Sequence, residues 1–203
     1  SPPLIACTIS VVSVQKRQVL RFLVTLPGLN AVAHVLGNPA GEFFVRDTIA
    51  MPGHPGAVSF AFVNEDQIPD MVAATSAGMV VALGATSTTF GPLTMFGTGG
   101  GSPSWTLADV DGDLKTDIVI ADARENRIVI LGNAQQTGLA AWPAEYATGV
   151  SPAAVTITDW TGDGVEDVLV ANSGSSSIGL FEGTIPGRLV GQRTVTVPGA
   201  PED

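Results

Sequence analysis

The amino-acid sequence repeats itself about every fifty residues, and this repetition restricts the fold more than any other feature. In the two clearest copies, a Ser-Pro pair precedes a short apolar run, an aspartate-rich loop and a second apolar run. These loops are Asp109–Asp117 and Asp159–Asp167. Equivalent positions at Gln18, Asp70, Asp117 and Asp167 are 52, 47 and 50 residues apart. The predicted repeats are therefore residues 3–54, 55–102, 103–151 and 152–203.

Each repeat contains about four segments with the pattern of β-strands. Short runs rich in Val, Ile, Leu and Thr are bounded by Gly, Pro, Asn and Asp. No window combines helical periodicity with a helix cap. Four-stranded units of this length are typical of propeller blades, because such a sheet covers its faces with neighbouring sheets. We predict an all-β chain of four blades, with residues 1–203 forming a single β-propeller domain or segment. A β-sandwich of unrelated strands is the alternative.

The composition excludes several classes of protein. Apolar residues make up 45% of the chain and charged residues 14%, which is too apolar for a disordered chain. The formal net charge of −10 disfavours nucleic acid and anionic membrane surfaces as partners and favours cations. The longest apolar stretch, Val19–Leu36, is interrupted by Arg21, Pro27 and His34. We therefore expect two buried strands joined by a turn there, and no membrane span.

The two aspartate-rich loops have the chemistry of a calcium site. Carboxylates stand at positions one, three, five and nine of the first loop, and alternate side chains of a tight loop can turn toward one centre. Oxygen ligands suit a hard cation, and calcium tolerates their flexible geometry better than magnesium does. Lys115 and Val165, at position seven, are placed to offer a backbone carbonyl. The candidate ligands are Asp109, Asp111, Asp113, Lys115, Asp117, Asp159, Thr161, Asp163, Val165 and Asp167.

Details of the loops modify this expectation. The neutral Thr161 replaces an aspartate and should weaken the second site. Leu114 stands where the second loop has Gly164, so the first loop forces a leucine to positive φ. An EF-hand is excluded because position twelve holds Ile120 and Val170 rather than a glutamate. The alternative for both loops is a solvated turn with Asx hydrogen bonds.

The two earlier copies of the loop are degenerate. The second repeat has Phe62 in place of the first carboxylate but keeps Asn64, Asp66 and Asp70, so metal binding there stays open. In the first repeat the ligand positions hold side chains with no carboxylate, and we expect no metal. These residues are Ser10, Val12, Val14 and Gln18.

With these motifs in hand, the chain resembles the FG-GAP or VCBS repeat family, the propeller repeat of integrin α-subunits and many secreted bacterial proteins. The resemblance rests on Asp109-Val-Asp-Gly-Asp-Leu-Lys-Thr-Asp117 and Asp159-Trp-Thr-Gly-Asp-Gly-Val-Glu-Asp167, each followed by an apolar strand. It implies calcium in the loop between the first and second strands of a blade. It also implies ligand binding at the opposite face, which would be built by Thr25–Asn30, Thr75–Gly78, Ala121–Asn126, Asn172–Ser177 and the junctions between blades.

The same resemblance bears on assembly and function. Members of the family usually close with about seven blades, so four repeats indicate part of a larger propeller that another chain could complete. The alternative is a closed propeller of four blades. We expect a secreted or cell-surface calcium-binding interaction or adhesion module whose partner is a protein or glycan. The alternatives are a glycan-binding lectin and a scaffold domain of a secreted polysaccharide-active enzyme. We assign no catalytic residues, because no nucleophile, zinc or phosphate-binding motif occurs in the sequence.

Overall fold

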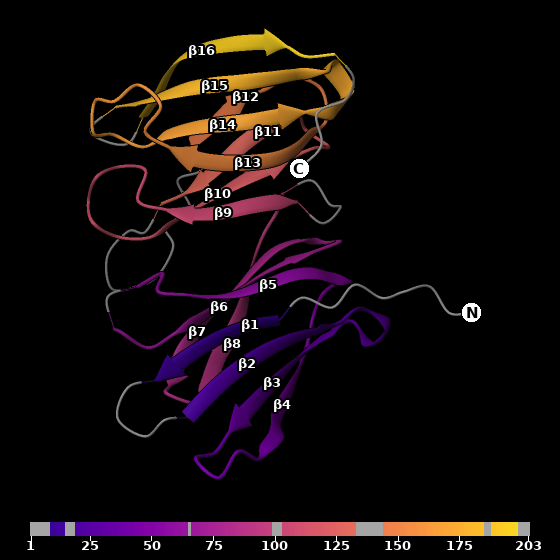
Figure 1. Ribbon diagram of the computed structural model, residues 1–203. Coiled ribbons are helices and arrows are strands. Elements are labelled where there is room, and N and C mark those ends of the chain that lie inside the picture. The colour runs from indigo at the N-terminus through magenta and orange to yellow at the C-terminus, as the bar shows by residue number, and fades with distance from the viewer. Residues whose placement is uncertain are drawn as a thin grey trace. The chain divides into compact units, whose positions relative to one another are not determined.

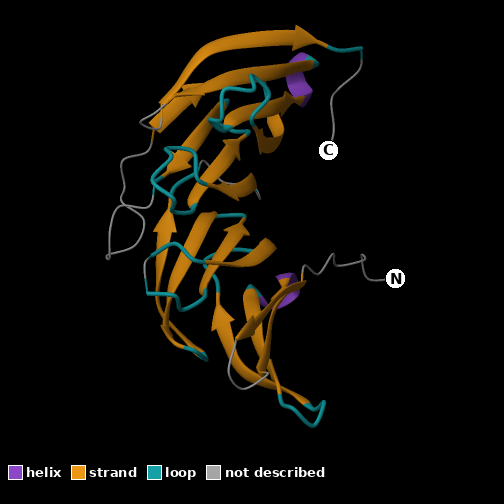
Figure 2. Cartoon of the chain, turned by 60° about the vertical axis from the view of Figure 1, so that its left-hand side comes forward, coloured by secondary structure: helices purple, strands orange, loops and turns teal. Residues whose placement is uncertain are grey.

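The computed structural model consists almost wholly of antiparallel strands (Figure 1). It describes residues 9–14, 19–64, 66–98, 103–132, 144–184 and 188–198. Within these ranges, helix is confined to the short 3-10 turns η1 (Pro27–Leu29) and η3 (Ser173–Ser175), drawn in purple in Figure 2. We find in the described residues no helix with the length and apolar character that a membrane crossing needs.

The strands form four separate four-stranded sheets, and in each sheet the strands lie in chain order. The first sheet contains β1 (Ile9–Val14), β2 (Val19–Leu26), β3 (Ala31–Gly37) and β4 (Phe43–Ala50). The second contains β5 (Pro55–Ala61), β6 (Asp70–Thr75), β7 (Gly78–Thr86) and β8 (Thr89–Phe96). The third contains β9 (Ser104–Ala108), β10 (Asp117–Asp122), β11 (Arg127–Leu131) and β12 (Ala144–Ala147). The fourth contains β13 (Pro152–Thr158), β14 (Asp167–Asn172), β15 (Ser177–Thr184) and β16 (Arg188–Thr196).

This arrangement confirms the prediction of four-stranded antiparallel units in an all-β chain. The four strands of each sheet fall within one predicted repeat. In the second and third sheets the second strand is the most buried: every residue of β6 and β10 is buried. Burial on both faces explains why their sequences are continuous apolar runs rather than alternating ones.

The apolar stretch Val19–Leu36 forms two strands, as predicted. β2 and β3 pair in antiparallel register from Leu20–Gly37 to Leu26–Ala31, with the turn η1 between them. Asn30 ends this turn at a φ of 48°, a left-handed conformation that asparagine adopts more readily than most residues. The Pro-Gly pair therefore separates two strands of one sheet.

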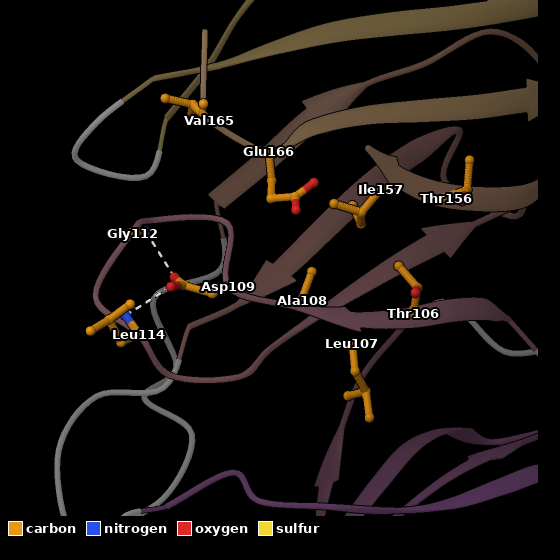
Figure 3. Close-up of a pocket in the computed structure, with 11 residues that line it drawn as sticks. Thr106, Leu107, Ala108, Asp109, Gly112, Leu114, Thr156, Ile157, Val165 and Glu166 are labelled. Atoms are coloured by element: carbon orange, nitrogen blue, oxygen red, sulfur yellow. Dashed lines mark hydrogen bonds between the residues drawn. The ribbon is translucent and has the colours of Figure 1, made fainter. Parts of the chain in front are cut away.

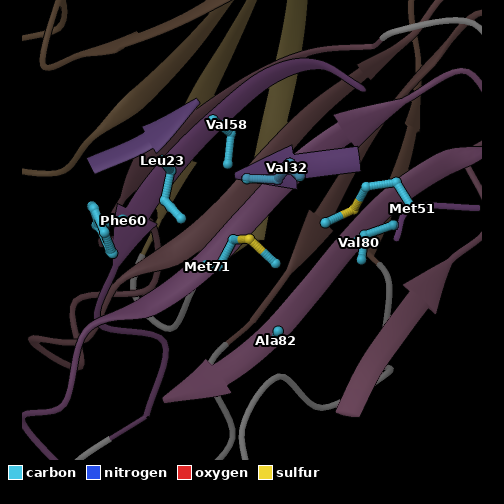
Figure 4. Close-up of a cluster of buried hydrophobic side chains, with 9 residues drawn as sticks. Leu23, Val32, Met51, Val58, Phe60, Met71, Val80 and Ala82 are labelled. Atoms are coloured by element: carbon cyan, nitrogen blue, oxygen red, sulfur yellow. The ribbon is translucent and has the colours of Figure 1, made fainter. Parts of the chain in front are cut away.

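The chain divides into two compact units, each with its own core. Unit 1 comprises residues 1–62 and 67–102, and unit 2 comprises residues 63–66 and 103–203. In unit 1, apolar side chains of the first two sheets pack together, among them Leu23, Val32, Met71 and Val80 (Figure 4). In unit 2 the corresponding cluster includes Val119, Ile130, Val170 and Phe181. Whether residues 1–203 form one domain stays a prediction.

A buried cation lies beside the core of unit 1. Arg21 is fully buried, its Nε donates to Nε2 of His34 at 3.1 Å, and its guanidinium lies 4.9 and 5.0 Å from the ring centres of Phe60 and Phe90. Burial lowers the pKa of Arg21 to about 10. Burial and the neighbouring Arg21 charge lower the pKa of His34 to about 4. His34 is thus a buried, hydrogen-bonded histidine in the described residues, whereas His54 is exposed.

Candidate metal centre

The two predicted loops occupy equivalent places in their sheets. Asp109–Asp117 leads from β9 into β10, and Asp159–Asp167 leads from β13 into β14. Each loop therefore joins the first strand of a sheet to the second, which is the location that the family resemblance implies. In both cases the last aspartate is also the first residue of the buried second strand. The strand thus fixes position nine, while positions one to eight form an irregular turn.

The backbone of the loops follows one conformation. Position four is a glycine at positive φ in both, with 75° at Gly112 and 76° at Gly162. Position six is also left-handed, with φ of 65° at Leu114 and 85° at Gly164. The prediction that the first loop forces a leucine to positive φ is confirmed. Gln67, at position six of the degenerate loop, has a φ of 57°, so this loop shares the conformation at that position despite its altered side chains.

The position-one aspartates organise the turns by accepting backbone hydrogen bonds. Oδ1 of Asp109 accepts from the amides of Gly112 and Asp113 at 2.8 and 3.1 Å, and Oδ2 accepts from Leu114 at 2.8 Å. Asp159 makes the same set with the amides three, four and five residues later, at 2.7, 3.2 and 2.9 Å. These hydrogen bonds lower the pKa of Asp159, and the bond from the Gly164 amide has the largest effect. The side chain therefore stays ionised and holds the turn closed.

Three carboxylates of the first loop converge. One oxygen each from Asp109, Asp111 and Asp117 lie within 4.8 Å of one another. Calcium binds oxygen at about 2.3–2.6 Å, so oxygens on opposite sides of one ion are separated by about 5 Å. The residues therefore fit a calcium ion in donor chemistry and in spacing. Burial, followed by the neighbouring Asp113 and Asp109 charges, raises the pKa of Asp111.

The other predicted ligands of the first loop lie differently. Oδ1 of Asp113 accepts from the backbone amide of Lys115 at 2.9 Å, and Oδ2 lies 3.5 Å from the Lys115 ammonium. Asp113 is not part of the three-residue cluster. A lysine inside the loop partly neutralises a carboxylate that the sequence pattern assigned to the metal.

The second loop is less converged than the first. Among the described residues, the carboxylates of Asp159, Asp163 and Asp167 form no such converged group. Thr161 stands at position three, where its hydroxyl lies 3.4 Å from Oδ1 of Asp159. Oδ1 of Asp163 accepts from the Val165 amide at 2.9 Å, as Asp113 does from Lys115. The loop lacks the central carboxylate that closes the cluster in the first one.

The position-nine aspartates have a structural role that sequence reasoning missed. Asp167 is fully buried; Oδ2 accepts from the amides of Trp160 and Thr161 at 3.0 and 3.1 Å, and Oδ1 accepts from Gly183 at 2.7 Å. Asp70, in the degenerate loop, accepts from Gly84 in the same way at 2.7 Å. Persistence of this aspartate where the position-one carboxylate is lost was a sequence signal that it does more than bind metal.

The degenerate loops add little to the metal hypothesis. Asn64 Nδ2 donates to Asp66 at 3.0 Å, and the amide of Asp66 donates back to Asn64 Oδ1 at 3.3 Å. These polar groups thus satisfy one another. Residues 15–18 of the first repeat, including Gln18, lie outside the described residues, and so do Cys7 and Trp142.

The loops expected to bind a partner join the second and third strands. They lie at residues 27–30, 76–77, 123–126 and 173–176. The third contains exposed Arg124 and Glu125, and its amides donate to Asp122. Arg127 forms salt bridges with Asp122 and Glu145, with nitrogen–oxygen distances of 3.3 and 2.7 Å. Burial alone would lower the pKa of Arg127, but these two carboxylates outweigh it and raise that pKa. This loop is the most charged of the four.

Comparisons with known proteins agree with the fold. A protein-family comparison matches the FG-GAP-like repeat at residues 63–120 and 109–170, which together span 108 of the 203 residues. Among solved structures, the chain is similar to one described as "Crystal structure of BBS1N in complex with ARL6DN, soaked with lead", with 13% identity and a TM-score of 0.62. The alignment covers 95% of this chain and 57% of that chain. No curated protein sequence matches. The four sheets are therefore propeller blades.

Proposed function

The chain belongs to the FG-GAP-like repeat family, and on this premise we propose that it is a calcium-stabilised β-propeller module that binds a macromolecular partner outside the cell. The observation that carries the proposal is the convergence of Asp109, Asp111 and Asp117 within 4.8 Å. Bound calcium would supply a positive charge that cancels their mutual repulsion and ties position one of the loop to the buried strand.

The second loop would hold a weaker calcium ion. Its backbone has the same left-handed residues and the same hydrogen bonds to position one as the first loop. Asp159 and Asp163 would supply carboxylates, Thr161 a neutral oxygen, and Val165 a carbonyl. One carboxylate fewer lowers the electrostatic attraction for a divalent ion, which supports a ranking of the two sites rather than equal affinity.

The expected affinity supports an extracellular location. Calcium sites in extracellular modules have Kd values of about 10⁻⁴ to 10⁻³ M. At about 1 mM calcium, each such site would contribute roughly 0.4 to 1.4 kcal/mol to stability. In cytosol with resting calcium these sites would stay empty. We therefore propose that the protein is secreted or displayed on a cell surface.

We propose that the protein or glycan partner binds the loops between second and third strands. These loops lie at the opposite ends of the strands from the calcium loops, so calcium would act by stiffening the blades. The charged loop at 123–126 offers Glu125 and Arg124 to a polar partner. The salt bridge from Arg127 to Glu145 would hold that loop in place.

We also propose that further blades cover the first sheet. Phe22, Val35 and Val45 are paired across β2, β3 and β4, so they share one face. Val45 and Phe43 are 60% and 58% exposed, and the Phe43 ring packs edge-on against Phe22 at 5.3 Å. Exposed apolar side chains on one sheet face need a cover in water, and another blade has the matching shape.

Thermal unfolding in calcium and in chelator tests the proposal. The wild type should unfold a few degrees higher in 2 mM calcium than in EDTA, since about 1 kcal/mol moves the midpoint of a protein this size by about 2–4 °C. Asp109→Ala combined with Asp159→Ala should abolish the shift. Glu125→Ala, which removes an acid at the other end of the sheet, should keep it. A calcium shift that survives the double substitution would place the ion elsewhere.

A further inference from the structure

A groove runs between the two innermost strands of unit 2, separate from the partner-binding loops proposed above. It lies between β9 and β13 and has a volume of about 600 Å³. Figure 3 shows the residues that line it. Thr106 and Ala108 line it from β9, and Thr156 and Ile157 line it from β13. The aspartate loops form its end, with Leu114 from one and Glu166 from the other.

The strands that border this groove are sheet edges. β9 pairs only with β10, and β13 pairs only with β14, in the described sheets. Each therefore has one side along which its backbone N–H and C=O groups are not used in a sheet. Such an edge is a template for an extended peptide, because the peptide can complete the hydrogen bonds of the strand.

Leu114 is an exposed apolar residue that the fold does not explain. Its side chain is 93% exposed, so it contributes nothing to the core, and its φ of 65° is unfavourable for leucine. The equivalent residue of the second loop is Gly164, which adopts the same conformation without strain. A partner packed on Leu114 would give this exposed apolar side chain a contact that the fold itself does not supply.

The charge of the groove selects the kind of partner. Its charged lining residues are Asp109 and Glu166, and both are acidic. Asp109 directs its oxygens to the amides of its own loop. The exposed Glu166 lines the groove, and its carboxylate has no partner among the described residues (Figure 3). A basic group on the partner is therefore complementary to Glu166.

We propose that this groove binds an extended peptide in which a basic side chain faces Glu166 and an apolar side chain packs on Leu114. The peptide backbone lies along the free edge of β9 or β13. The site does not depend on bound calcium, because neither Leu114 nor the Glu166 side chain belongs to the candidate ligand set. Calcium in the loops reduces the negative field around the groove and so weakens, without preventing, the attraction of a basic peptide.

Fluorescence anisotropy with two labelled octapeptides tests this inference. One alternates threonine with leucine and arginine, and the other has glutamate in place of arginine. The arginine peptide should bind at least about tenfold more tightly than the glutamate peptide at low salt. Glu166→Gln should weaken its binding about two- to fivefold and reduce the salt dependence. Glu42→Gln, the matched change at an exposed acid of the first repeat outside both proposed binding surfaces, should leave binding unchanged.

Leu114→Gly provides the second arm. It restores the glycine of the equivalent loop, so the variant should fold and unfold at a temperature no lower than the wild type. It should nevertheless weaken the arginine peptide about fivefold at both low and high salt, because the lost contact is apolar. Full retention of peptide binding by this variant would overturn the proposal.

Three further outcomes contradict the inference. Equal effects of Glu166→Gln and Glu42→Gln would indicate general electrostatic attraction rather than a site. Complete displacement of the peptide by 2 mM calcium would place the peptide in the aspartate loops. Failure of the arginine peptide to bind better than the glutamate peptide would reject a basic peptide as occupant. Binding of a glycan but of neither peptide would reject it in the same way. The outcomes of the Glu166→Gln and glutamate-peptide comparisons do not bear on calcium binding, which the unfolding experiment tests separately.

Discussion

Replacing the buried aspartate at position nine of the second loop separates a structural role from metal binding. Asp167 is fully buried and accepts three backbone hydrogen bonds, from Gly183 on one oxygen and from Trp160 and Thr161 on the other. Asparagine has the same shape but one acceptor oxygen. Its amide nitrogen must face at least one backbone N–H, which leaves that donor buried and unpaired.

The cost of Asp167→Asn follows from these bonds. Losing one hydrogen bond to a charged acceptor costs about 1.5–3 kcal/mol, and the remaining two weaken when the acceptor becomes neutral. The substitution also removes the free-energy cost of burying a charge, which offsets part of this loss of stability. We expect a net loss of about 3 kcal/mol, equal in EDTA and in calcium apart from the small contribution of the ion.

Urea unfolding followed by tryptophan fluorescence measures this loss, with extrapolation to water in both buffers. Asp159→Asn is the comparison: it also disturbs backbone hydrogen bonds, but its carboxylate is exposed, so water can replace a lost bond and the loss of stability in EDTA should be smaller. The reasoning is refuted if Asp167→Asn stays within about 0.5 kcal/mol of wild type in EDTA, the range of an ordinary surface change.

Three further predictions follow from local geometry. Leu114→Gly should stabilise the protein by up to about 1 kcal/mol in urea unfolding, because relief of left-handed strain exceeds the added flexibility of the unfolded chain; a loss of stability would contradict the strain argument. Gly183→Ala should destabilise by several kcal/mol or prevent folding, on the order of a buried steric clash, since its Cβ would collide with the backbone carbonyl of Glu166, whereas Gly91→Ala meets only Leu83 O at 3.5 Å and should be tolerated in the same assay. Folding stability should fall as the pH drops from 6.5 toward 4, because the unfolded state protonates His34 there while the folded state, with a pKa of about 4, does not; His34→Gln should flatten that part of the urea-unfolding profile, and an unchanged slope would show that His34 is not its source.

Much of the architecture was predictable because the sequence is locally consistent. The loops between first and second strands follow from aspartate spacing, and the apolar runs after Asp117 and Asp167 mark buried second strands. The left-handed conformation of Leu114 followed from its alignment with Gly164. Each of these features depends on neighbours in the chain, which a repeat pattern displays directly.

Features that depend on distant contacts were not predictable. Gly183 lies sixteen residues from Asp167, so the hydrogen bond that makes this aspartate structural is invisible in the motif. Arg21 interrupts an apolar run, yet it is buried through contacts with Phe60 and Phe90 of another sheet. The difference between the two loops in carboxylate convergence also depends on side-chain orientation rather than on spacing.

An NMR titration of the ¹⁵N-labelled protein with calcium tests the central claim most directly. The amides of Gly112 and Gly162 donate to Asp109 and Asp159, so their resonances report the two loops separately. Calcium should move both resonances with half-saturation at about 0.1–1 mM, at a lower concentration for Gly112 than for Gly162, and should leave Gly78 of the second sheet in place. Resonances of Gly112 and Gly162 that stay fixed through 10 mM calcium would contradict the assignment of a calcium site to these loops.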